Sequence, residues 1–457
     1  MTWNLRYQAK SYIRSALWII PLVAVLLEQV IWWVVLGLDT RLGWKGLGLG
    51  VHGAEELFNA VTTLALSFIV FTFGSLLVAI QIASGQYTPR IIATTLLRDN
   101  VIRYTAGIFV FTFIFSVKAA GRMETSVQQL VAFITANLGL TCIVAFLYLI
   151  DHAAKMLRPV SLVRRVGEDG LAVIESLYPE QFTEVESITS PQQSVGATVH
   201  TILHRGKAAI VIAVNVKKLV AEAEKANGVI EFAPQVGDFV GSGEPLFRLH
   251  GGAGAVDERK LRASVVFGGE RTIEQDPLFA VRILVDIAIK ALSKAINDPT
   301  TAVLAIDQLN RLLRRAGKRN LGTDQILDRS GEVRVIFQSP NWEDFVNLAF
   351  SEIRFYGAEN IQIARRLRAM IVNLKDSLRA QRHPALCEQL DLLDRMIEKV
   401  YILPEDLKLA RIPDPQGLGG SSHSKEPALQ VSEKEDHPEG LDDRAEQVLS
   451  SHNSLRL

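Results

Sequence analysis

The chain has 457 residues, with 49 basic and 49 acidic side chains and a formal net charge of zero. This balance removes the electrostatic basis for strong nucleic-acid binding, so we expect no nucleic-acid partner. Hydrophobic residues make up 48% of the chain, and long runs of them gather in the first third, which disfavours a simple soluble protein.

Four apolar runs follow one another in that first third, joined by short polar links. A run of about 20 apolar residues spans a bilayer as a helix, whereas a soluble protein would have to bury it on every side. Backbone groups in lipid must pair within their own segment, so each run predicts a transmembrane helix. The runs cover residues 15–38, 57–83, 104–117 and 126–150.

Basic residues in the connecting segments predict the orientation. Lys and Arg collect on the cytoplasmic side of a membrane protein. They are frequent in the N-terminal arm, in the second loop and after the fourth run, but they are sparse in the first and third loops. We therefore expect a multi-pass protein of the bacterial inner membrane with both termini in the cytoplasm. The basic residues are Arg6, Lys10, Arg14, Arg90, Arg98, Arg103, Lys155, Arg158, Arg164 and Arg165.

Polar residues inside the runs are the candidates for a transport path. Asn59, Thr63 and Ser67 fall on one face of the second run, with Gln81 near its end. Such a face can line a path for an ion or small solute, or it can pack against another helix through hydroxyl groups. Glu28 lies within the first run, where a carboxylate is costly and marks a functional site by default. The alternative for Glu28 is protonation or a hydrogen bond to a neighbouring helix.

The segment after the runs divides by composition. Residues 156–198 read as a helix and linker, and 199–256 as a small β-rich barrel-like domain, because β-branched stretches alternate with glycine turns. The pattern V-G-D-x-V-x-x-G-x-P-L from Val236 onward resembles barrel-sandwich hybrid domains such as biotinyl and lipoyl carriers. No Met-Lys pair lies near it, so we expect no covalently attached cofactor.

Residues 257–411 predict a helical cytoplasmic domain, and 412–457 a disordered tail that is poor in apolar residues. Asp276-Pro277 and Asp298-Pro299 each place a capping residue before a proline at the first helical position. Two consecutive helices that begin in this way form a helical hairpin. Arg282 and Asp286 are four residues apart and can pair along the first of them. Residues 342–401 predict three further amphipathic helices.

These motifs carry a family resemblance. The chain contains R-T-x-x-Q-D from Arg271 to Asp276, L-V-D-I-A from Leu284, and N-D-P-x-T-A from Asn297 to Ala302, together with SGQYTPRII from Ser84. It resembles the bacterial predicted membrane proteins that carry domain of unknown function 2254, over about residues 15–400. Lys294 stands where that family usually has proline. The resemblance implies a four-span membrane region and a cytoplasmic domain, and no established activity.

Catalytic and metal-binding motifs are not found: the sequence has no P-loop, GxSxG or HExxH pattern and no paired histidines at metal-ligand spacing. We therefore expect neither an enzyme, a cofactor nor a metal site. The motif segment instead predicts a ligand-binding or interfacial cluster, with a solvated ion-pair face and ordinary helix caps as the alternatives. Its residues are Arg271, Gln275, Asp276, Arg282, Asp286, Asn297 and Asp298.

Two functions are compatible with this α-helical membrane protein of four transmembrane helices and a mixed α/β cytoplasmic domain. The first is an oligomeric channel or transporter-like protein with a cytoplasmic regulatory domain, its path lined by Glu28, Asn59, Thr63, Ser67 and Gln81. Four spans are few for a lone transporter, so we expect a homo-oligomer in the lipid bilayer. The second is a membrane-anchored sensor or scaffold that binds a partner or ligand through its helical domain. Neither the ion nor the ligand follows from the sequence.

Overall fold

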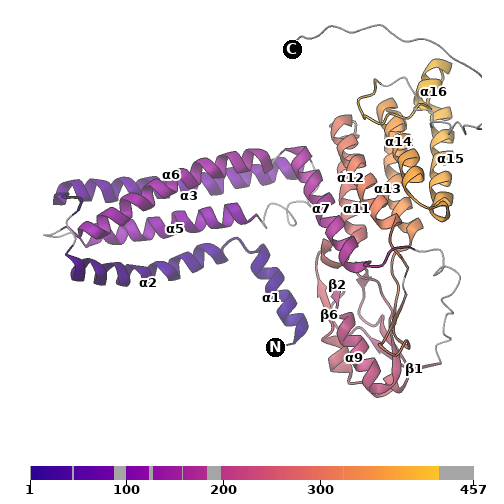
Figure 1. Ribbon diagram of the computed structural model, residues 1–457, viewed down its shortest axis with the longest axis horizontal. Helices are drawn as coiled ribbons and strands as arrows, with labels where there is room; N and C mark the ends of the chain where they lie inside the picture. The colour runs from indigo at the N-terminus through magenta and orange to yellow at the C-terminus, as the bar shows by residue number, and fades with distance from the viewer. Residues whose placement is uncertain are drawn as a thin grey trace, which may run out of the picture. The chain divides into compact units, whose positions relative to one another are not determined.

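The fold is described from a computed structural model that covers residues 2–43, 46–86, 99–122, 127–156, 158–182, 197–322 and 324–420. Three predicted features lie wholly or mostly outside these ranges. They are the second loop with Arg90, Arg98 and most of the SGQYTPRII motif, most of the linker before residue 197, and the tail beyond residue 420. The arrangement of the labelled helices and strands can be followed in Figure 1.

The N-terminal region is helical. Within the described ranges, four helices are long and apolar enough to cross a membrane, and each overlaps one of the predicted runs. One of the four, α5, packs against the other three, and half of it is buried against 17–28% for the others, so it forms the centre of the bundle. A short helix, α1, precedes the bundle. The bounds are α1 Trp3–Ser15, α2 Ile19–Leu42, α3 Val51–Gln86, α5 Asn100–Gly121 and α6 Gln129–Met156.

Close packing joins the helices of the bundle. Gly139 of α6 lies against α3, because a Cβ at this position would come within 2.9 Å of Val61 Cγ2. One turn or more along the same helices, the rings of Phe68 and Phe146 stack with their centroids 4.0 Å apart. Small residues and stacked rings are the contacts through which helices associate in lipid.

A second helical core follows the bundle. Its central helix, α11, is buried on almost every side and packs against α7, α12 and α13. The two predicted Asp-Pro starts are confirmed: Asp276 accepts a hydrogen bond from Phe279 N at 3.0 Å, and Asp298 accepts one from Thr301 N at 3.1 Å. The bounds are α7 Pro159–Leu177, α11 Pro277–Ala291, α12 Pro299–Gly317, α13 Trp342–Gly357, α14 Ile361–Ser377, α15 His383–Val400 and α16 Pro404–Ala410.

Among the residues that the structure describes, eight strands form two sheets beside this core. The larger has the order β1-β5-β3-β8-β7 and is antiparallel except for the parallel pair β3 and β8; the smaller has the order β4-β2-β6. The short helices α9 Val216–Ala226 and α10 Glu258–Arg262 lie between strands in the chain. The strands are β1 Thr198–Leu203, β2 Ala209–Val214, β3 Gly228–Phe232, β4 Phe239–Val240, β5 Pro245–Gly251, β6 Val265–Gly268, β7 Gln325–Leu327 and β8 Val333–Phe337.

The predicted small β-barrel over residues 199–256 is wrong. In the described part of the chain the strands form two open sheets, and no sheet closes on itself. The physical reason is that strand partners come from elsewhere: β6, β7 and β8 all follow residue 256, and β8 inserts beside β3 in parallel. Turn patterns report local geometry, whereas pairing across a hundred residues leaves no local signal.

Candidate functional site

The predicted path-lining residues of the second run share one exposed face of α3. Asn59, Thr63, Ser67 and Gln81 are all exposed in the protomer, and at about 100° per residue they fall within an arc of about 80°. The Ser67 hydroxyl donates to the carbonyl oxygen of Thr63 at 2.7 Å, which satisfies it within the helix. These four residues define the polar face of α3, which the bundle does not cover and which also carries the exposed apolar side chains of Val70 and Leu77.

Glu28 lies elsewhere. It is fully buried between α2 and α5, and its Oε2 accepts from Lys118 Nζ at 2.8 Å, while Lys118 also donates to Gln29 Oε1 at 2.8 Å. The second carboxylate oxygen, Oε1, has no hydrogen-bond partner among the described residues. Glu28 thus joins two helices through an ion pair and is not brought together with the four polar residues of α3.

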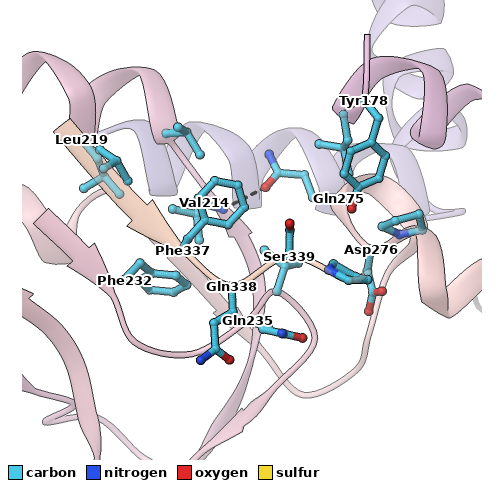
Figure 2. Close-up of a pocket in the computed structure, with 16 residues that line it drawn as sticks. Tyr178, Val214, Leu219, Phe232, Gln235, Gln275, Asp276, Phe337, Gln338 and Ser339 are labelled. Atoms are coloured by element: carbon cyan, nitrogen blue, oxygen red, sulfur yellow. Dashed lines mark hydrogen bonds between the residues drawn. The ribbon is translucent and has the colours of Figure 1, made fainter. Parts of the chain in front are cut away.

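A cavity lies where the sheets meet α7 and α11, and its volume is about 100 Å³. Figure 2 shows Tyr178, Gln275 and Asp276 on one side and Phe232, Phe337 and Leu219 on the other. Most of the wall is apolar, and Gln235, Gln338 and Ser339 add further polar groups to it. The remaining lining residues are Leu177, Val214, Val216, Gln235, Val236, Pro277, Val335, Gln338, Ser339 and Pro340.

The R-T-x-x-Q-D segment forms the polar side of this cavity through the 3₁₀ turn η3 Ile273–Gln275. Gln275 Oε1 accepts from Val214 N at 2.9 Å, which ties the turn to strand β2. Asp276 Oδ2 accepts from Arg271 Nε at 3.1 Å while Oδ1 caps α11. Burial raises the pKa of Asp276 above its ordinary range, and the Arg271 guanidinium opposes this effect. The motif is therefore locked to a strand on one side and to a helix on the other.

Tyr178 completes the polar side and was not predicted. Its side chain is 6% exposed and lines the cavity. Burial raises the pKa of Tyr178, and the nearby carboxylates of Asp276, Asp324 and Asp344 raise it further, so the phenol stays protonated. A tyrosine between the end of a helix and Pro179 carries no sequence signal for this role, because the cavity forms only when residues 150 positions away pack against it.

A groove of about 530 Å³ opens beside the cavity, and Gln235 lines both. Arg282 lies in it and pairs with Asp286, 2.6 Å away on the same helix, and with Glu352 of α13. The hydrogen bond from Arg282 lowers the pKa of Glu352, and the same contact raises the pKa of Arg282. The predicted residues Arg271, Arg282 and Asp286 are thus brought together, and the sequence did not reveal their partner Glu352.

Asn297 and Asp298 lie apart from both hollows, in the turn between α11 and α12. Asn297 has a positive φ of 49°, which asparagine tolerates better than most residues. Asp298 accepts from the backbone N–H of Thr301 at 3.1 Å and from its hydroxyl at 2.5 Å. The contacts of this pair are those of a helix start.

The comparisons with known proteins bear on the whole of this arrangement. Residues 14–373 match the family of predicted membrane proteins described as DUF2254. The chain belongs to this family. It is also 26% identical over 419 residues to the uncharacterized protein Rv1290c of Mycobacterium tuberculosis and to the uncharacterized protein Mb1321c of Mycobacterium bovis, a match that covers 87% of this chain and 79% of each relative. No solved structure matches the chain.

The DUF2254 match confirms the resemblance that the motifs carry, and it identifies a membrane protein. The matched region contains the polar face of α3, the cavity and the groove. Within the residues that the structure describes, no group of three or more His, Cys, Asp or Glu side chains is arranged to hold a metal ion.

Proposed function

We propose that this DUF2254 protein is an oligomeric channel in the bacterial inner membrane, with the polar faces of α3 around the path and the cytoplasmic domain as its regulator. The observation that carries the proposal is the exposure of Asn59, Thr63, Ser67 and Gln81 on one face of the protomer. Polar side chains that face lipid are costly, whereas a water-filled path or a second subunit satisfies them.

We do not expect the path to run through the centre of a single protomer. The central position of the protomer is filled by α5, whose buried residues include Phe109 and Phe115. A path along α3 therefore runs outside the protomer and requires copies arranged around a symmetry axis.

The charges at the start of α3 favour cations. Glu55 and Glu56 are exposed there, and Glu56 pairs with His52 at 3.2 Å along the same helix. A ring of carboxylates at the mouth of a pore attracts cations and repels anions. Under the orientation that the basic segments indicate, with both termini in the cytoplasm, this end of α3 lies on the outer side.

Contacts of α1 support a regulatory role for the cytoplasmic domain. Tyr7 donates a hydrogen bond to Glu274, which is the neighbour of Gln275 in η3, and Trp3 and Tyr7 pack beside Ile212 and Val266 of the smaller sheet. Three residues separate the end of α1 from the start of the first membrane helix, α2. A structural change at the cavity could thus be transmitted from η3 through its hydrogen bond to α1, and from α1 along the chain to α2.

Flux from proteoliposomes tests the proposal. The purified full-length protein is expected to release K⁺ faster than Cl⁻, and Thr63→Leu and Ser67→Leu are expected to slow K⁺ release. Val144→Leu on the exposed face of α6 is the matched control and is expected to leave the flux unchanged. Absence of K⁺ flux, or a flux that both α3 substitutions leave intact, would refute the channel.

A membrane-anchored sensor or scaffold is the alternative, and the convergence of the R-T-x-x-Q-D segment and Arg282 on two adjoining hollows favours it. In that case the protein conducts nothing, and Asp286→Ala weakens the capture of a partner because Arg282 loses one of its two carboxylates. A K⁺ flux that is independent of any partner would argue for the channel instead.

A further inference from the structure

We propose that the cavity between Tyr178, Gln275 and Phe232 is a binding site for a compact, uncharged molecule about the size of one six-membered ring. The apolar body of this ligand would lie against the strand side chains, and its hydrogen-bonding end would face Tyr178 and Gln275. The inference does not depend on whether the protein conducts ions.

The size and the lining of the cavity determine the size and the apolar character of the ligand. Its volume of about 100 Å³ is of the same order as the ~150 Å³ apolar cavity that accepts benzene in an engineered protein. Phe232, Leu219 and Val335 are almost fully buried on one side of it. Aromatic and branched side chains of this kind favour a flat apolar ring over water.

Two polar groups on the opposite side fix its hydrogen-bonding end. The Tyr178 side chain lines the cavity and is 6% exposed, and its hydroxyl can donate one hydrogen bond. The side-chain oxygen of Gln275 accepts a hydrogen bond from Val214 N, so the Gln275 amide N–H₂ can serve as a donor to a ligand. A ligand oxygen placed between the Tyr178 hydroxyl and the Gln275 amide would accept a hydrogen bond from both.

The surrounding charges favour a neutral ligand. Asp276 borders the cavity, and Asp324 and Asp344 act on the same phenol, so an anion would meet three carboxylates. Arg271, the nearest cation to Asp276, is already paired with it at 3.1 Å. A cation would lose its hydration, while both oxygens of Asp276 are already occupied by Arg271 and Phe279 N.

Three probes of equal size separate these charge states: benzamide, benzoate and benzamidinium. Binding is measured by saturation-transfer NMR and by the shift in melting temperature of the full-length protein in lipid nanodiscs. Benzamide is expected to bind and to raise the melting temperature, and both charged probes are expected to bind more weakly. Tyr178→Phe is expected to weaken benzamide binding about fivefold through the loss of one hydrogen bond.

Matched variants keep the test decisive. Tyr401→Phe removes a tyrosine hydroxyl that has no hydrogen-bond partner among the described residues and does not line the cavity, so it should leave benzamide binding unchanged. Val216→Phe fills the cavity and should abolish binding, with circular dichroism confirming that the variant folds. The inference is overturned if benzamide does not bind up to its solubility limit, if a charged probe binds as tightly, or if folded Tyr178→Phe and Val216→Phe bind it as the natural chain does.

Discussion

Asp276 and Asp298 begin consecutive helices with the same Asp-Pro pair, yet their surroundings differ. Both cap a helix, but Asp276 is only 4% exposed and its carboxylate also accepts from Arg271, whereas the Asp298 carboxylate accepts from Thr301 in the first turn of its own helix. The chemistry of the cap is local, so the sequence predicts it for both. The burial that makes Asp276 part of a cavity comes from distant strands.

This difference predicts unequal costs of truncation. Asp276→Ala should lower the free energy of unfolding by about 2–3 kcal/mol, because the helix loses its cap and Arg271 loses its partner. Asp298→Ala should cost about 1 kcal/mol, which is the ordinary loss of a cap. Urea unfolding of the full-length protein in detergent, followed by circular dichroism, measures both. Equal losses would show that the contact with Arg271 contributes nothing to stability.

Glu352 makes stability depend on acidity in a defined direction. Its hydrogen bond with Arg282 lowers its pKa below the ordinary value of 4.5. A group of this kind adds stability above that value, and the contribution disappears as the pH falls through the lowered pKa. Its side chain is 42% exposed, so solvent screening limits the contribution to less than about 1 kcal/mol.

Glu352→Gln isolates this contribution. The melting temperature of the natural chain should exceed that of the variant near neutral pH, and the two should converge as the pH falls from about 7 to about 3. Differential scanning fluorimetry of both proteins measures the difference. A constant difference across this range would mean that the Arg282–Glu352 pair does not stabilise the fold.

At the scale of elements, the sequence predicts what is periodic and misses what is assembled from distant parts. The four apolar runs, the two Asp-Pro helices and the helices α13, α14 and α15 each carry their own pattern. The parallel pair β3 and β8 joins segments about a hundred residues apart, which is why a barrel was expected in place of two sheets. Tyr178 and Glu352 were missed for the same reason, since both acquire their roles only by long-range contact.

The packing of α7 depends on one glycine. A Cβ at Gly170 would lie 2.8 Å from Ala280 Cβ and 3.1 Å from Leu312 Cδ2, so α7 meets α11 and α12 at this point with no room for a side chain. Gly170→Val should therefore destabilise the helical core around α11 by about 2–3 kcal/mol, as overpacking does. Gly37→Ala, where a Cβ has no neighbour within 4 Å, is the control. Urea unfolding of both variants would disprove the close contact if Gly170→Val were as stable as the natural chain.

At the scale of the whole molecule, the account depends on one surface, the polar face of α3. Inside the protomer, the bundle buries the opposite side of α3 through residues such as Ala54, Phe58 and Ala65. The exposed polar side then faces either lipid, at a cost, or a water-filled path that several copies enclose. Helix α1, which precedes the first membrane helix, is hydrogen-bonded to η3 through Tyr7 and Glu274 and would connect such a path to the cavity.

Cysteine accessibility tests this claim most directly. Cys142 is buried, and the exposed Cys387 is replaced by serine so that it does not react with the thiol reagent. Ser67→Cys and Val144→Cys are compared, since the Phe68–Phe146 stack places their segments at the same depth. We expect a membrane-impermeant thiol reagent to modify Ser67→Cys in intact vesicles and to leave Val144→Cys unmodified. If Ser67→Cys is as inert as Val144→Cys, the polar face of α3 does not line a water-filled path.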